Sequence, residues 1–131
     1  MNFEEIYKND IFANQTGIII EELNQQHAKL SFTVEARHLN AGNVAHGGAI
    51  FTLCDIAMAA MANFKQPVSV SIQSDIRFLA VALEGDRLTA EAIEVFGRKK
   101  MYNCRVSVTN QNGELIAIAE GMFHTKNNLK M

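Results

Sequence analysis

The stretch that decides the fold covers residues 46–64 and reads HGGAIFTLCDIAMAAMANF. Two glycines follow the opening histidine, and almost every later residue is apolar, with Asp55 as the only formal charge. A helix that is hydrophobic on all faces has to be buried in a protein or in a membrane. A carboxylate inside such a helix is costly unless it is paired, hydrogen-bonded or neutral. The stretch therefore predicts a buried central helix, and Asp55 is the residue in it that needs an explanation.

A membrane is the less favoured surrounding for this helix. The apolar run is about 17 residues long, at the short limit for crossing a bilayer. Lys65 is its only basic flank, and segments with strand-like alternation lie on both sides. Residues 1–5 do not resemble a secretory signal. We therefore expect a helix covered by protein, no membrane partner and a cytoplasmic location.

Composition sets the class of protein. The chain has 131 residues, which suits one domain over residues 1–131, and its net charge of -2 lacks the basic footprint of a nucleic-acid binder. Cys54 and Cys104 have no CxxC spacing. We expect buried thiols in a reducing compartment, with a disulfide or a reactive thiol as the alternative.

Apolar residues outside the helix recur with a period of two, which predicts strands. The expected strands are residues 18–23, 28–35, 68–79, 87–96, 100–109 and 114–125. Gly97 is expected to end the fourth strand, and Asn112-Gly113 predicts a two-residue hairpin turn. A short helix is expected at 2–8, turn formers follow it, and the polar segment 126–131 is expected to be frayed.

These elements predict an α+β fold. Hairpins imply an antiparallel sheet, and a sheet with one apolar face must bury that face against another layer. The all-apolar helix is the available cover, so the sheet has to curve around it. One helix leaves further apolar surface unclaimed, and we therefore expect the chain to oligomerise.

Several motifs together resemble one known family. They are His46-Gly47-Gly48 followed by Leu53, Asp55 and Ala57, with Asn40 upstream, then Ser74-Asp75-Ile76-Arg77-Phe78-Leu79, Gly97-Arg98-Lys99 and Asn112-Gly113-Glu114-Leu115-Ile116-Ala117. Over residues 15–125 the chain resembles the hotdog-fold acyl-CoA thioesterases of the phenylacetate-degradation (PaaI-like) type. The resemblance implies a curved antiparallel sheet wrapped around one long central helix. It also implies homodimers whose sheets join edge to edge, often paired into homotetramers.

Two segments depart from the family pattern. Ala80-Val81-Ala82 stands where members often have Pro or Gly, and Asn43-Val44-Ala45 replaces a shorter loop before the histidine. Both segments concern loop shape, and so substrate preference, more than the chemistry.

Asp55 is the first candidate catalytic residue. A carboxylate there can act as nucleophile or as general base for thioester cleavage. The alternative is a buried acid that is satisfied by donors for structural reasons. Gly47 and Gly48 are candidates because a helix N-terminus offers unpaired N–H groups that can polarise a carbonyl, as in an oxyanion hole. Tight helix packing is the alternative explanation for these glycines.

The spacing between these residues predicts a site shared by two subunits. Gly47 and Asp55 are eight residues apart, which is about 12 Å along a helix. One carbonyl cannot easily reach both on the same chain. If both act on one substrate, they come from different subunits, and the resemblance likewise implies a site at the dimer interface.

Four further residues are candidates for assisting roles. The resemblance implies that Asn40 orients the water or the carbonyl, although it could instead cap its loop. His46 is expected to hydrogen-bond within the loop more than to act as a base. Ser71 and Gln73 are expected on one strand face, where they could complete the site or simply face solvent.

Arg98, Lys99 and Lys100 form a basic cluster at a turn. They could hold coenzyme A phosphates or be an ordinary charged turn. The four histidines have no metal-ligand spacing, so no metal is expected. No cofactor is expected either, because coenzyme A belongs to the substrate.

The sequence thus predicts a thioesterase that hydrolyses an acyl-CoA to a carboxylic acid and free coenzyme A. A non-catalytic acyl-CoA-binding or regulatory protein on the same fold would keep the pocket without needing Asp55. A hotdog dehydratase would need a His–acid pair, which the sequence does not offer in a suitable arrangement. The sequence does not define the acyl group.

Overall fold

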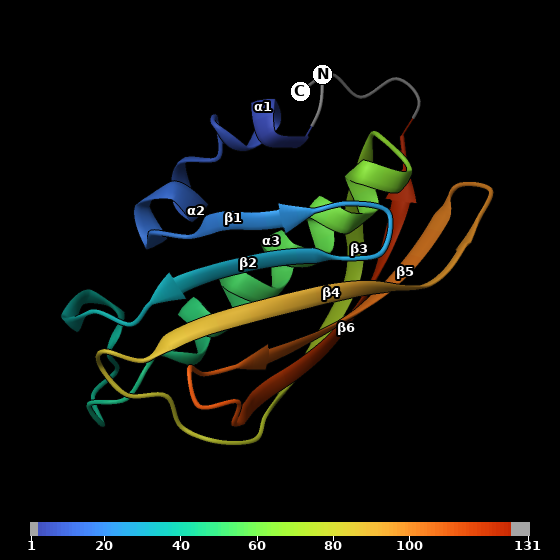
Figure 1. The fold of residues 1–131 in the computed structure, drawn as a ribbon. Helices are drawn as coiled ribbons and strands as arrows, with labels where there is room; N and C mark the ends of the chain where they lie inside the picture. The colour runs from blue at the N-terminus through green and yellow to red at the C-terminus, as the bar shows by residue number, and fades with distance from the viewer. Residues whose placement is uncertain (1–2, 127–131) are drawn as a thin grey trace.

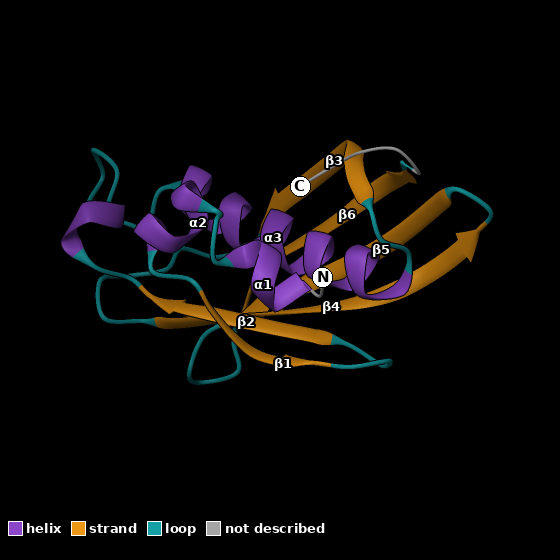
Figure 2. Ribbon diagram, turned by 90° about the horizontal axis from the view of Figure 1, so that it is seen from above, coloured by secondary structure: helices purple, strands orange, loops and turns teal. Residues whose placement is uncertain are grey.

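The computed structural model describes residues 3–126, in which one curved sheet wraps around one long helix (Figure 1). The elements in chain order are α1 (Phe3–Tyr7), α2 (Ile11–Thr16), β1 (Ile19–Leu23), β2 (Ala28–Thr33), the 3-10 turn η1 (Ala36–His38), α3 (Gly47–Lys65), β3 (Ser69–Phe78), β4 (Arg87–Arg98), β5 (Met101–Thr109) and β6 (Leu115–Thr125). The six strands form a sheet in the order β1-β2-β4-β5-β6-β3, with every pair antiparallel. Seen from above, the sheet curves around α3, with β1, β2 and β4 on one side of the helix and β3 at the opposite edge of the sheet, and α1 and α2 pack on α3 (Figure 2). The predicted α+β hotdog fold is confirmed.

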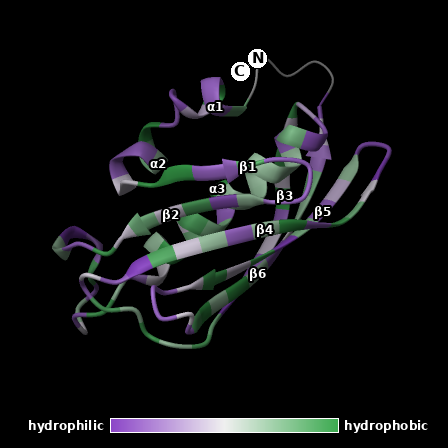
Figure 3. Ribbon diagram, viewed as in Figure 1, coloured by the Kyte–Doolittle hydropathy of each residue, from purple (hydrophilic) through white to green (hydrophobic). Residues whose placement is uncertain are grey.

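The core is the interface between α3 and the concave face of the sheet. Leu53, Ala57 and Met61 are fully buried on the helix, as are Leu30 and Val108 on the strands. Figure 3 shows apolar residues along α3 and on the strands that face it. The helix is long and apolar enough to cross a membrane, but 56% of its most apolar window is buried inside the fold. Burial under the sheet therefore accounts for its apolar composition.

Local hydrogen bonds fix both ends of α3. At the N-terminus, the extended backbone of His46 lets its Nδ1 accept the N–H of Gly48 at 2.8 Å. At the C-terminus, the buried Asn63 side chain accepts the N–H of Ser69 at 2.8 Å and donates to its carbonyl at 3.1 Å. The helix is thereby tied directly to the start of β3.

Near the N-terminus, the prediction of a single helix was incomplete. The helix expected at 2–8 is α1, and a second helix, α2, follows it. Asp10 is the N-cap of α2 and accepts the N–H of Ala13 at 3.0 Å, while Gly17 ends the helix at φ 85°. The turn formers in this segment are therefore the two caps of a short helix.

The ends of the later strands also differ from the prediction. β4 continues through Gly97 to Arg98 instead of ending at Gly97. The predicted two-residue turn at Asn112-Gly113 is wrong, because the Asn110 N–H bonds to the Glu114 carbonyl at 3.0 Å and closes a longer loop. The side chain of Asn110 accepts the N–H groups of Asn112 and Glu114 and so fixes that loop. Of the tail expected to be frayed, 127–131 lie outside the described residues.

The two cysteines are free and buried, as predicted. Burial raises the pKa of each thiol to about 12. Neither thiol is therefore ionised at neutral pH.

Gly121→Ala is expected to destabilise the fold. Gly121 lies on β6 where the strand faces α3, and an added Cβ would lie 3.0 Å from Sδ of Met58 and 3.1 Å from Oγ of Ser74. Overpacking of a filled core costs about 1–3 kcal/mol. A lower denaturant midpoint checks this, with Glu120→Ala, an exposed neighbour, as the control. An unchanged midpoint would show that the Met58 side chain can move away from the added Cβ without loss of stability.

Candidate active site

One face of α3 is left uncovered by the sheet. Gly48, Thr52, Asp55 and Ala59 follow helical spacing along this face and are half-buried or exposed. The face runs from the helix N-terminus past its midpoint. Any substrate that reaches the helix has to approach it here.

Asp55 lies in the middle of this face with a half-buried carboxylate. Within residues 3–126 it has no hydrogen-bond or ion-pair partner. Its burial raises the pKa of the carboxyl above the usual range, and the nearby carboxylate of Asp10 adds to the rise. A structural acid would be expected to have donors, so the geometry favours the functional interpretation.

The first N–H groups of α3 are not equally available. His46 Nδ1 accepts from Gly48, and the His46 carbonyl accepts from Ala49 and Ile50 at 3.0 and 3.3 Å. The N–H of Gly47 donates to no residue in the described part of the chain. Gly47 is therefore the free donor at this helix end, while Gly48 is already used. His46 has the structural role that the sequence favoured.

The ring of Phe78 lies against Gly47. A Cβ on Gly47 would lie 3.0 Å from Cζ of that ring. The glycine therefore permits close approach of β3 as well as exposing the backbone N–H. Packing and access to the N–H both favour glycine at this position.

Asn40 lies in the exposed loop before α3, and its side chain hydrogen-bonds to the backbone of that loop. Its Oδ1 accepts the N–H groups of Gly42 at 2.8 Å and Val44 at 3.3 Å. The loop-cap alternative is thus present in the structure. The amide NH₂ of Asn40 has no partner among residues 3–126, so it is still available as a donor.

The expectation that Ser71 and Gln73 share a strand face is wrong. A β-bulge between these two residues shifts the register of β3 against β6. Ser71 Oγ lies 3.2 Å from Ser74 Oγ, on the face toward α3, whereas Gln73 contacts Asp75 at 3.4 Å. One extra residue in a strand turns the later side chains to the other face. Ser71 therefore stays a site candidate, and Gln73 does not.

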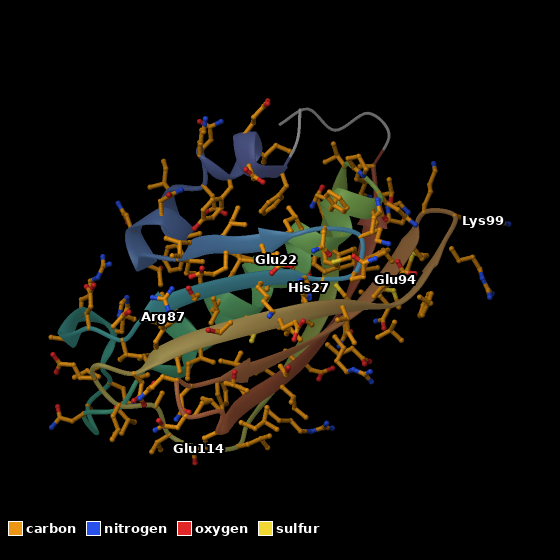
Figure 4. The ribbon with its side chains drawn as sticks, viewed as in Figure 1. Glu22, His27, Arg87, Glu94, Lys99 and Glu114 are labelled. Carbon is orange, nitrogen blue, oxygen red and sulfur yellow. The ribbon has the colours of Figure 1, made fainter. Side chains whose placement is uncertain are left out.

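The basic cluster lies far from the start of α3 in the same protomer. Arg98, Lys99 and Lys100 form the tip of the β4–β5 hairpin, which Figure 4 shows projecting beyond the C-terminal end of α3. Lys99 has a left-handed backbone with φ 54°. A single protomer does not bring these side chains together with Gly47.

Asp10 is a residue that sequence reasoning missed. Its carboxylate is close enough to raise the pKa of Asp55, and it reaches the helix because α2 packs on α3. The spacing of Asp10 and Gly17 is the signal that could have revealed α2. Within residues 3–126, no group of three or more His, Cys, Asp or Glu side chains could hold a metal ion.

Asp10→Asn is expected to move the acidic limb of the pH–kcat/KM profile to lower pH. Removing a negative charge favours the ionised form of Asp55, so the pKa of that carboxyl falls. Asparagine is as good an N-cap as aspartate, so α2 is retained. Asp10→Ala, which loses the cap as well, is the comparison. A limb that does not move would show that Asp10 does not act on the titrating group.

The fold defines a class. A six-stranded antiparallel sheet curved around one long helix is the fold of a hotdog thioesterase. The Thioesterase superfamily model matches residues 42–117, and the chain belongs to this family.

Comparison with known proteins shows which members of the family this chain resembles. An esterase-like protein of Archaeoglobus fulgidus is 37% identical over 93% of this chain and 79% of its own length. The acyl-coenzyme A thioesterase PaaI of Escherichia coli is 32% identical over 94% of this chain and 88% of its own. The structure of E. coli PaaI superposes with a TM-score of 0.92 over 96% of this chain and 91% of that chain. The chain is therefore a PaaI-like enzyme of the thioesterase class.

A more distant structure carries a ligand. A thioesterase protein of Streptococcus pneumoniae was solved with coenzyme A, at 28% identity and a TM-score of 0.80 over 83% of this chain and 85% of that chain. Variants of that protein have alanine in place of an aspartate and in place of a threonine 16 positions after it.

Proposed function

We propose that this protein hydrolyses an acyl-CoA thioester to a carboxylic acid and free coenzyme A. One observation carries the proposal. The N-terminus of α3 presents the Gly47 N–H, which donates to no described residue, and the uncovered face presents the Asp55 carboxylate, which has no described partner. These are the two groups that thioester hydrolysis needs, a donor for the carbonyl oxygen and a base or nucleophile. The acyl-CoA substrate of E. coli PaaI and the coenzyme A bound to the S. pneumoniae protein support the choice of substrate.

The proposed reaction begins with the thioester oxygen at the Gly47 N–H. Asp55 removes a proton from water as the water oxygen bonds to the carbonyl carbon. The developing negative charge on the carbonyl oxygen is stabilised by the N–H and the helix dipole. The C–S bond then breaks, and the sulfur leaves as the thiol with the proton from Asp55. Direct attack by the Asp55 carboxylate, followed by hydrolysis of the anhydride, is the alternative course.

The site is proposed to form between two subunits. Gly47 and Asp55 are about 12 Å apart along one helix, too far to serve one carbonyl. β3 is an edge strand of the sheet, and Ile72 and Phe78 on it are 53% and 51% exposed. An exposed apolar edge strand presents unpaired backbone N–H and C=O groups that can pair with a strand of another chain. Dimers that join through β3 would cover it, and pairing of dimers into tetramers is a further expectation.

Asn40 and Ser71 are proposed to assist. The NH₂ of Asn40, which has no described acceptor, is available to orient the water or the carbonyl. Ser71 follows Asp55 by 16 positions, the spacing of the two positions altered in the S. pneumoniae protein. Arg98, Lys99 and Lys100 are proposed to bind coenzyme A phosphates, within reach of a site that includes the partner.

The test is a panel of acyl-CoA thioesters with a free-thiol readout on the wild-type protein. Release of thiol from at least one substrate, with saturation kinetics, supports the proposal. Tight acyl-CoA binding without thiol release would instead identify a binding protein on the same fold. Hydration of an enoyl-CoA would identify a dehydratase.

A further inference from the structure

A groove lies between α2 and the first two turns of α3. Its volume is about 330 Å³. It is lined by Phe12 and Thr16 of α2, by Arg37, His38 and Leu39 at η1, and by His46, Gly48, Ala49 and Thr52 at the start of α3. We call it the α2 groove.

The α2 groove begins beside the candidate oxyanion donor. Gly48 directly follows Gly47, whose N–H donates to no described residue, and Thr52 is one turn before Asp55 on the same face. A thioester whose oxygen accepts from the Gly47 N–H could therefore extend one of its two substituents into the groove. Those substituents are the acyl group and the pantetheine arm of coenzyme A.

Two polar side chains of the lining, Arg37 and His38, already make hydrogen bonds within the protein. Arg37 donates to Glu35 at 2.9 Å and to the carbonyl of Gln15. His38 Nδ1 accepts the N–H of Glu35 at 2.9 Å, and its Nε2 lies 2.8 Å from the carbonyl of Thr16. These contacts hold the His38 ring in place and use two of the five N–H groups of Arg37, whose side chain is 50% exposed.

The other lining side chains are mostly apolar, or have hydroxyl groups that already donate hydrogen bonds within the protein. Thr16 and Thr52 donate their hydroxyls to carbonyls one turn earlier in their own helices, at 2.9 and 2.7 Å. Phe12, 68% exposed, contributes the largest apolar surface, with Leu39 and Ala49 beside it. Nε2 of His46 and the remaining N–H groups of Arg37 are the polar groups of the lining side chains that have no described partner. A pantetheine arm with two amides would lose hydrogen bonds to water here, whereas a hydrocarbon would not.

We infer that the α2 groove receives the acyl group, and that Phe12 makes the enzyme prefer a bulky apolar one. This inference rests on the proposed function, because it assigns a subsite to that substrate. A cavity of about 150 Å³ binds benzene, so the groove has room for an aryl ring or a medium-length alkyl chain.

One wall of the groove lies inside the segment that the family model matches, and the other wall lies outside it. The family model matches from residue 42, so it includes the α3 wall but not Phe12, Thr16 or η1. The outer wall can thus change acyl preference without disturbing the residues that polarise the thioester.

The test measures binding of coenzyme A thioethers, which are not hydrolysed. The wild type is expected to bind S-octyl-CoA at least about tenfold more tightly than S-methyl-CoA. Phe12→Ala should bring this affinity ratio close to one. Ile11→Ala is the matched control, because Ile11 is 72% exposed on the same helix but does not line the groove. Ala49→Leu, which fills the groove from the α3 wall, should also lower the ratio.

The ratio separates this inference from the proposed function. If Phe12→Ala weakens both thioethers equally, or keeps the wild-type ratio as Ile11→Ala should, the groove does not hold the acyl group. A wild-type ratio near one overturns the inference as well. Thiol release from octanoyl-CoA is measured separately. If the thioether ratios behave as expected while no acyl-CoA is hydrolysed, the subsite stands and the hydrolase assignment fails.

Discussion

Asp55→Asn is expected to lower kcat/KM for acyl-CoA hydrolysis by about 10²–10⁴-fold, the usual contribution of a positioned base. Asparagine keeps the size of the side chain and removes its ability to accept a proton or to attack the carbonyl. A free-thiol assay measures the loss. Asp75→Asn on β3 serves as the control, because Asp75 is an exposed acid on the outer face of the sheet.

The same substitution is expected to stabilise the fold at neutral pH. Burial raises the pKa of Asp55 in the folded state, so the folded protein binds this proton more tightly than the unfolded chain does. The charged carboxylate therefore costs stability, and this cost grows as pH rises from the ordinary value of 3.8 through the folded-state pKa. Thermal melts should show the variant above wild type at pH 7 and equal to it at pH below 3.8. Full activity in the variant, or lower stability at pH 7, would contradict the assigned role.

Gly47→Pro is expected to lower kcat/KM by about 10²–10³-fold relative to Gly47→Ala. Proline removes the N–H, and it is well tolerated as the first residue of a helix. The extended backbone of His46, with φ -63° and ψ 135°, suits a residue that precedes proline. Both variants add a Cβ against the half-exposed ring of Phe78 and keep its packing effect similar. Equal activity in the two variants would show that this N–H does not hold the oxyanion.

Mixing subunits tests where the two groups meet. A dimer of one Asp55→Asn and one Gly47→Pro subunit has one site with both groups intact, provided that each site combines Gly47 of one subunit with Asp55 of the other. Random pairing of equal amounts then restores about a quarter of wild-type activity. No recovery in a mixture shown to contain heterodimers would mean that both groups act within one subunit.

The helix and its carboxylate could be predicted because their signals are local and strong. A long all-apolar run with one acid fits few positions in a β-rich chain other than a buried central helix. A site between two subunits, inferred from the eight-residue spacing of Gly47 and Asp55, stays a prediction. The bulge in β3 could not be predicted, since nothing in the alternation around Ser71 and Gln73 indicates the extra residue. Helix α2 was missed because its six residues are too few to show a helical period, leaving only the caps Asp10 and Gly17 as evidence. Asn110 overrode the Asn112-Gly113 signal by bonding the loop backbone with its side chain.

The use of N–H groups at the start of α3 also bears on how the product leaves. Because His46 occupies three of them, a single donor remains at Gly47 for an incoming oxygen. A thioester presents one oxygen there and is neutral. The carboxylate product presents two oxygens and a full negative charge, and the start of α3 offers no second N–H for the second oxygen. In the proposed site between two subunits, the product would also face the ionised Asp55 of the neighbouring subunit. Repulsion between these two negative charges then favours release of the acid. The Asp55 carboxylate, which begins the reaction by taking a proton from water, would therefore also promote product release.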